Sequence, residues 1–198
     1  MKRRSFLLAL AAWPLARTEA ATGDEAIPSA YQAIAAQYGV PPDFFYALAC
    51  TESLTDLRTG RPRPWPWTLN IAGRAARFEQ REQASAALQR QLQAGVLSVD
   101  VGLVQVNWRY HGARLGEPWQ ALEPLHNLQV GAAILREQYE ATGDWWAAIG
   151  RYHSPGNEAR AARYRLAVAR QVLRIQREVL AERSRLQPGA ALVWGGRS

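Results

Sequence analysis

The chain has 198 residues, and 48% of them are hydrophobic, which excludes an intrinsically disordered protein and allows one packed core. The formal net charge is +7, and every basic residue except Lys2 is arginine. This balance favours an anionic partner, such as a nucleic acid, a membrane surface or an acidic wall polymer. Cys50 is the single cysteine, so an internal disulfide and a thiolate metal cluster are excluded.

The N-terminal segment has the pattern of an export signal. Lys2–Arg4 supplies the positive charge, residues 6–16 form a short apolar stretch, and residues 18–20 offer small side chains for cleavage. The apolar stretch is too short to span a bilayer as a helix. We therefore expect residues 1–20 to be a signal peptide and the chain to be exported to the periplasm. Arg3–Arg4 also fits a twin-arginine signal, but adjacent arginines are common in general secretory signals, which we favour.

Two helices are expected next. Residues 27–38 carry apolar side chains at helical spacing and are followed by Gly39, a common C-cap. Residues 44–53 follow Pro42, which is typical of a first helical turn. On this second helix, Glu52 ends an otherwise apolar stripe. Burial would keep its carboxyl protonated, as a general acid requires; alternatively, Glu52 simply reaches water at the helix end.

The middle of the chain has weaker patterns. Residues 68–78 are expected to form a small hairpin, and residues 81–94 form a helix by their apolar spacing. Residues 98–107 alternate only at their end, so we expect them to be too short and too isolated to build a sheet. We interpret residues 60–98 as an insertion between two parts of one domain.

Three helices are expected in the last third. The first begins with Asn127 as its N-cap and reaches residue 140, and the second covers residues 145–151 after a cap at Asp144. The last one covers residues 157–184, with an apolar stripe on one side and arginines on the other. We interpret these arginines as a solvated face. The alternative is a DNA contact, but we expect no specific nucleic acid partner.

Taken together, the patterns predict a single, mostly α domain of six or seven helices with one small irregular β element. The domain would span residues 21–184, and residues 185–198 would form a flexible tail.

The sequence lacks the arrangements needed by several chemistries. The three histidines have no metal-ligand spacing, no glycine-rich loop carries a lysine, and no serine lies in a nucleophile elbow. We therefore expect neither a metal nor a cofactor. What remains is Glu52 together with amides and aromatic rings of the kind that hold sugars. These candidates are Asn70, Gln105, Asn107, Tyr152 and His153. Taken singly, Tyr152 also fits a core tyrosine, and Gln105 a surface amide.

Four sequence blocks occur in a characteristic order: Glu52–Ser53, Val101–Asn107, Glu123–Gly131 and Trp145–Gly156. This order resembles the soluble lytic transglycosylase family, over about residues 28–165. The resemblance is strongest to small exported members found with conjugation and secretion systems, including integrative conjugative elements. The chain departs from the family pattern at Val104, where Met is usual, and at His153, where Asn is usual.

The resemblance implies an α+β, lysozyme-like fold and a monomer that acts on peptidoglycan glycan strands. Glu52 would be the catalytic acid and base, Gln105 would line the sugar groove, and Tyr152 would hydrogen-bond near the Glu52 carboxyl and position it. Ser53 and Asn107 would support the site less directly. A component of a conjugation or secretion apparatus is a further expected partner.

The implied reaction is cleavage of the β-1,4 bond between N-acetylmuramic acid and N-acetylglucosamine, with a 1,6-anhydro product. Two alternatives stay open. A lysozyme-type muramidase would cut the same bond with water and use Asp56 or Asp100 as a second carboxylate. A non-catalytic wall-binding component would use the same groove without turnover.

Overall fold

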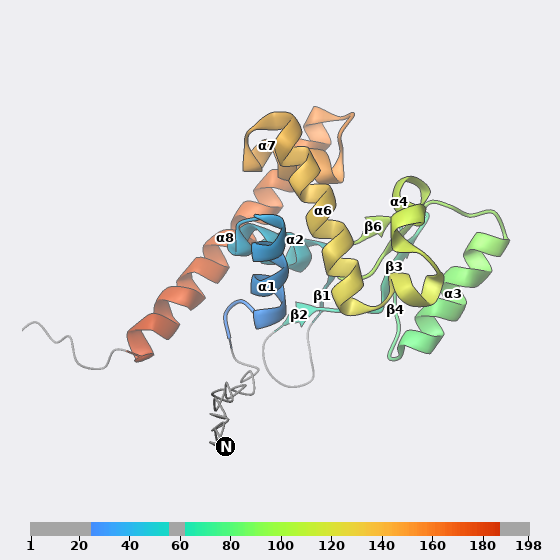
Figure 1. The fold of residues 1–198 in the computed structure, drawn as a ribbon, viewed down its shortest axis with the longest axis horizontal. Helices are drawn as coiled ribbons and strands as arrows, with labels where there is room; N and C mark the ends of the chain where they lie inside the picture. The colour runs from blue at the N-terminus through green and yellow to red at the C-terminus, as the bar shows by residue number, and fades with distance from the viewer. Residues whose placement is uncertain (1–24, 56–61, 187–198) are drawn as a thin grey trace, which may run out of the picture.

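The structure is a computed structural model that describes residues 25–55 and 62–186. The expected signal peptide, most of the expected tail and Asp56 lie outside these residues. The elements form two groups, and the long helix α6 belongs to the first and reaches the second (Figure 1). Among the described residues, no helix combines the length and apolarity that a membrane span requires.

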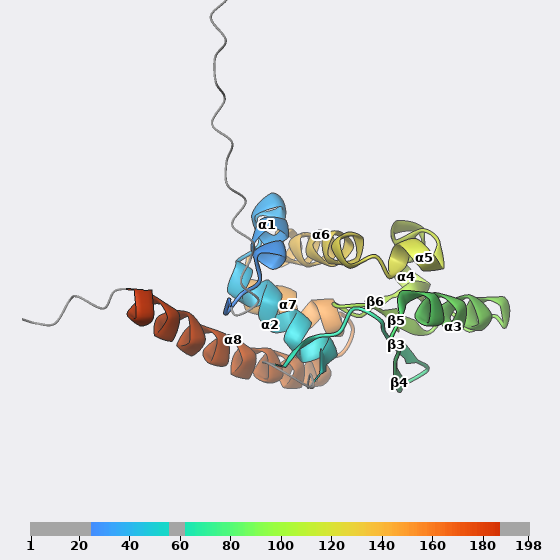
Figure 2. The ribbon, with the colours of Figure 1, turned by 90° about the horizontal axis from the view of Figure 1, so that it is seen from below.

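The first group is helical. Helix α8 packs against α2 and α7, while α1 packs against α2 and α6 (Figures 1 and 2). The bounds of these helices are α1 (Ser29–Tyr38), α2 (Pro42–Ser53), α6 (Pro124–Thr142), α7 (Trp145–His153) and α8 (Glu158–Leu186).

The second group is a small antiparallel sheet with three helices beside it. The sheet has the strand order β4-β3-β5-β6. Its strands are β3 (Thr68–Ile71), β4 (Arg74–Arg77), β5 (Val99–Val101) and β6 (Val106–Asn107), and the helices are α3 (Arg81–Gln93), α4 (Trp108–Leu115) and α5 (Pro118–Ala121). A separate two-stranded ribbon, β1 (Leu54–Thr55) with β2 (Arg63–Pro64), follows α2.

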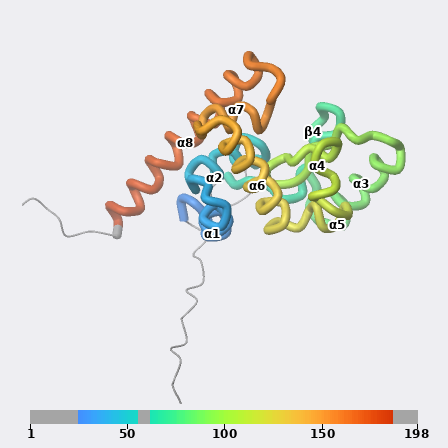
Figure 3. Tube along the Cα trace, turned by 45° about the horizontal axis from the view of Figure 1, so that its top comes forward, coloured from blue at the N-terminus to red at the C-terminus, as the bar shows by residue number. Residues whose placement is uncertain are grey.

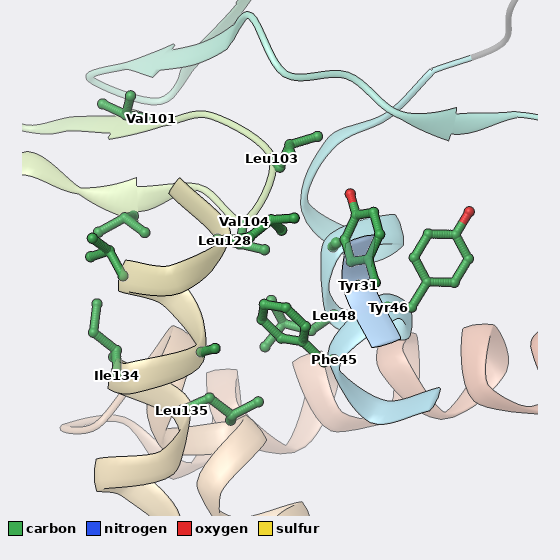
Figure 4. Packing of buried hydrophobic residues seen from close by; sticks show 14 of the residues in the cluster. Tyr31, Phe45, Tyr46, Leu48, Val101, Leu103, Val104, Leu128, Ile134 and Leu135 are labelled. Carbon is green, nitrogen blue, oxygen red and sulfur yellow. The ribbon is translucent and has the colours of Figure 1, made fainter. Parts of the chain in front are cut away.

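The core is centred on α2, where Phe45 and Leu48 are fully buried. The ring of Tyr31 on α1 meets that of Tyr46 edge-on, with centroids 4.8 Å apart. Leu135 of α6 faces this cluster, and Figure 4 shows side chains of α1, α2 and α6 packed in one interior. Because α2 is buried along most of its length, the residue at its end is held in a defined position.

Most of the expected elements are confirmed. The hairpin is β3 with β4, and the helices expected at residues 27–38, 44–53, 81–94, 145–151 and 157–184 are present within a few residues of their predicted ends. The mostly α fold with a small β part and a long last helix is also confirmed.

Two expectations were wrong. Residues 98–107 do build a sheet, because β5 pairs with β3 on one side and β6 on the other. The partner strand lies about thirty positions earlier, so the segment only looked isolated along the sequence. Asn127 is not an N-cap: α6 begins at Pro124, and the Glu123 side chain accepts from the His126 backbone N–H. Helices α4 and α5 were not expected at all.

Candidate active site

A cleft of about 820 Å³ lies between the helical group and the sheet. Six of the seven residues selected from the sequence line it: Glu52, Asn70, Gln105, Asn107, Tyr152 and His153. They come from α2, β3, the loop before β6, the end of β6, and the end of α7. Residues separated by as many as 101 positions, Glu52 and His153, are thus brought to one cleft.

Glu52 occupies the last turn of α2, with its side chain 15% exposed. Burial raises the pKa of this carboxyl from 4.5 to about 7; a hydrogen bond from Tyr164 opposes the shift, and the negative charge of Asp100 adds to it. The carboxyl therefore opens to the cleft while most of it is withdrawn from water. Near neutral pH it can both donate and accept a proton, which suits a group that acts as acid and then as base.

Tyr164 holds the Glu52 carboxyl. Its hydroxyl donates to Glu52 Oε1 at 2.6 Å, and the residue is buried on α8. The ring of His153 stacks on the ring of Tyr164, with centroids 4.3 Å apart and planes 3° from parallel. His153 Nδ1 lies 3.9 Å from Glu52 Oε1, and burial lowers the pKa of His153, which favours a neutral ring beside the carboxyl.

The hydrogen bond expected from Tyr152 is therefore made by Tyr164. The Tyr152 hydroxyl instead donates to the backbone oxygen of Val104 at 2.7 Å. Tyr152 lines the cleft, but its direct effect is on the loop of residues 102–105. The physical reason is that α7 places Tyr152 over this loop, while α8 packs along α2 and brings Tyr164 to Glu52.

Ser53 does not line the cleft, so any effect it has on the site is indirect. The residue is fully buried, and its hydroxyl donates to the backbone oxygen of Leu103 at 2.6 Å. On the other side of the same loop, Asn127 Oδ1 accepts from the Val104 N–H at 3.3 Å, and Asn127 Nδ2 donates to the Val101 oxygen at 3.0 Å. The loop is therefore fixed by side chains from three helices.

Gln105 projects from this loop into the cleft. Its φ of +44° is unusual for a residue with a side chain and marks a turn held by its surroundings. Gln105 Nε2 donates to the backbone oxygens of Gly102 at 2.8 Å and Thr68 at 3.1 Å. Because no group in the described residues donates to Gln105 Oε1, this oxygen can accept a hydrogen bond from a sugar hydroxyl or acetamido N–H.

Asp100 brings a second carboxyl to the cleft from β5. Asn107 Nδ2 donates to its Oδ1 at 2.6 Å, and Asn70 Nδ2 donates to its Oδ2 at 3.0 Å. Burial raises the pKa of Asp100, and these two amide hydrogen bonds oppose that shift by stabilising the charged form. Asn70 and Asn107 thus both bond to Asp100 and both line the cleft, and Asn107 Oδ1 also caps α4 by accepting from the Arg109 N–H.

Three arginines, Arg77, Arg151 and Arg160, also line the cleft. Among the described residues they outnumber the two carboxyls that line the cleft, and they suit a substrate that carries negative charge. Sequence reasoning did not select these arginines. It also missed Tyr164, which appeared only as part of the apolar stripe of the last helix. A signal was present, since a tyrosine in a buried stripe needs a partner for its hydroxyl.

Among known protein families, the model described as transglycosylase SLT domain matches residues 29–171, which is more than half of the chain. Every cleft residue described above falls within the matched range. No curated protein and no solved structure matches the chain.

Proposed function

Because the chain belongs to the transglycosylase SLT-domain family, we propose that it cleaves the β-1,4 bond between N-acetylmuramic acid and N-acetylglucosamine in peptidoglycan and leaves a 1,6-anhydro end. The observation that carries this proposal is Glu52. One mostly buried carboxyl, with a pKa of about 7, faces a cleft large enough for several sugar rings.

In the proposed reaction, protonated Glu52 donates its proton to the glycosidic oxygen. The bond from that oxygen to C1 of the muramoyl ring breaks, and the ring passes through an oxocarbenium-like state. The substrate's own acetamido group stabilises the positive charge at C1. The 6-hydroxyl oxygen then bonds to C1, and the Glu52 carboxylate accepts its proton. The carboxyl ends as it began, and no water is consumed.

The remaining cleft residues fit supporting roles. Tyr164 would keep one Glu52 oxygen fixed while the other exchanges protons, and Gln105 Oε1 would bind the sugar. The stacked ring of His153 would limit the motion of Tyr164.

A second candidate, hydrolysis of the same bond by water, is favoured by one observation. Asp100 lines the cleft with Glu52, so a second carboxylate is available to activate water or to stabilise the cation. The proposals differ in what attacks C1: the sugar's 6-hydroxyl in the first and water in the second.

Mass spectrometry of muropeptides released from purified cell walls distinguishes these candidates. The transglycosylase proposal predicts anhydro ends, each lighter by one water than the reducing ends that hydrolysis produces. Asp100→Asn provides the matched variant. If the 6-hydroxyl attacks, this variant should still release anhydro ends. Reducing ends from the wild type, together with no release by Asp100→Asn, would establish hydrolysis. A wall-binding component without activity would release neither.

We further propose that the chain is exported and opens the wall locally for a conjugation or secretion apparatus. The supporting features are the N-terminal signal pattern and the resemblance to small exported relatives of such systems. Fractionation of cells producing the full chain tests the first part: a shortened chain in the periplasm is expected, and an uncleaved chain confined to the cytoplasm would overturn it.

A further inference from the structure

Helix α8 has an apolar face that no other part of residues 25–55 and 62–186 covers. Its inner side carries Val168 and Ile175, both fully buried. Its outer side carries Leu166, Leu173 and Leu180, which are 64%, 57% and 62% exposed. The exposed leucines therefore form a row of their own, separate from the stripe that anchors the helix.

An arginine stands three residues before each exposed leucine. The sequence from residue 163 to residue 180 thus repeats the pattern Arg-x-x-Leu-x-x-x with a period of seven. The arginines of the repeat are Arg163, Arg170 and Arg177, and none of them has an ion-pair partner among the described residues. Two acids of the helix pair with other arginines, Glu158 with Arg165 and Glu178 with Arg174.

A period of seven keeps side chains on one line of a helix, because seven residues are close to two full turns. The leucine row is about 21 Å long at 1.5 Å per residue. Ala162 and Ala169 lie four residues before the first two leucines, so small side chains fill the alternate positions of the same seam. A regular leucine seam with charge on its flank is the pattern that packs against another helix.

The surroundings leave room for such a helix. Figures 1 and 2 show the C-terminal part of α8 running clear of every other described element, and Figure 3 shows the same from a third direction. The leucine row faces away from α2, since the residues that pack inward lie on the opposite side of α8.

We propose that this outer face of α8 docks an amphipathic helix of a partner protein, with apolar residues at seven-residue spacing and acidic residues opposite Arg163, Arg170 and Arg177. A second copy of the chain fits less well, because it would add a second arginine row and no acid to the seam. A membrane surface favours a broader apolar face than one leucine every two turns. The inference is independent of the reaction in the cleft.

A synthetic helix four heptads long, with leucine at the core positions and glutamate at the flanking positions, probes this face directly. A matched peptide has lysine in place of glutamate. By calorimetry with the full chain, the acidic peptide should bind at least about tenfold more tightly than the basic one. Arg163→Glu, Arg170→Glu and Arg177→Glu combined should reverse that preference.

Two control variants separate the seam from general charge and apolarity. Arg74→Glu, Arg90→Glu and Arg109→Glu combined remove three exposed arginines elsewhere and should leave the preference unchanged. Leu166→Ser, Leu173→Ser and Leu180→Ser combined should abolish binding, whereas Leu97→Ser with Leu125→Ser should not.

Three results would overturn the proposal. The first is a failure of the charge test: either the acidic peptide does not bind, or the control arginine variant loses as much of the preference for the acidic peptide as the variant at Arg163, Arg170 and Arg177 does. The second is a wild-type chain that sediments as a dimer while the leucine variant sediments as a monomer, which would make a second copy the occupant. The third is binding of the chain to vesicles of equal parts phosphatidylglycerol and phosphatidylcholine, in the absence of any binding to the acidic peptide. This vesicle binding would have to be lost in both the leucine variant and the variant at Arg163, Arg170 and Arg177.

Discussion

Glu52 owes its properties to the place where α2 ends. The helix is buried along most of its length, and its last turn delivers the carboxyl to the edge of the cleft. The sequence predicted this much, because an acid ended an apolar stripe. It did not predict the partner of the carboxyl: Tyr164 lies 112 positions later, and only the packing of α8 on α2 brings it close.

The raised pKa of Glu52 makes a prediction about stability. Between pH 4.5 and about 7 the folded chain keeps this proton while the unfolded chain loses it, so the wild type loses stability as the pH rises through that window. Glu52→Gln removes this dependence. Its free energy of unfolding relative to the wild type should rise by about 3 kcal/mol between pH 4 and pH 8. Urea denaturation at both pH values measures it, and a constant difference would contradict the assigned burial.

Tyr164 should act as a positioning residue. Its hydrogen bond stabilises charged Glu52, so Tyr164→Phe should raise the pKa of Glu52 and move the alkaline limb of the pH–kcat/KM profile upward, with a lower maximal rate. Tyr152→Phe is the control, because its hydroxyl bonds to Val104 and not to Glu52. A limb that moves with Tyr152→Phe and stays in place with Tyr164→Phe would reverse the assignment.

At the scale of elements, the loop of residues 102–105 places Gln105 in the cleft that Glu52 also lines. Gly102 has a φ of +83°, and a Cβ there would lie 2.5 Å from the Asn127 amide, so only glycine fits. The resemblance pointed to this block and to the helix that carries Asn127. It could not show that the two blocks are in contact, because the hydrogen bonds join residues more than twenty positions apart.

Gly131 of α6 supports the same loop. A Cβ at this position would clash with the Val104 side chain and approach the Tyr152 hydroxyl at 3.3 Å. Gly131→Ala should therefore lower the free energy of unfolding by about 1–3 kcal/mol and also reduce kcat/KM, since Gln105 is on the displaced loop. Gly156→Ala, where a Cβ would meet no atom of the described chain within 4 Å, should leave stability nearly unchanged. Equal melting temperatures for the two variants would contradict this packing.

At the scale of the whole molecule, α8 closes the helical group and carries a second face that the rest of the described chain leaves exposed. The helix and its inner stripe were predicted from apolar spacing alone. The sheet was not, because its pairing of β3 with β5 joins segments separated by α3. Local periodicity identifies long amphipathic helices well, but strand pairing across thirty residues depends on tertiary contacts that no local window contains.

Shortening a side chain should cost much more stability on the inner face of α8 than on its outer face. Ile175→Ala removes fully buried methyl and methylene groups and should destabilise the domain by about 2–4 kcal/mol. Leu173→Ala, two residues earlier and 57% exposed, should change the free energy of unfolding by less than about 0.5 kcal/mol. Thermal or urea denaturation of the two variants measures this, and a comparable loss in both would mean that the outer face is covered in the isolated chain.

The role proposed for Glu52 is to perform both the acid and the base step of peptidoglycan cleavage. Its most direct test is the release of soluble muropeptides from purified cell walls by the wild type and by Glu52→Gln, at equal concentration and with folding checked by circular dichroism. The amide can neither donate the proton to the glycosidic oxygen nor accept one later, so release should fall at least about a thousandfold while the fold is kept. Undiminished release by a folded Glu52→Gln variant would contradict the account.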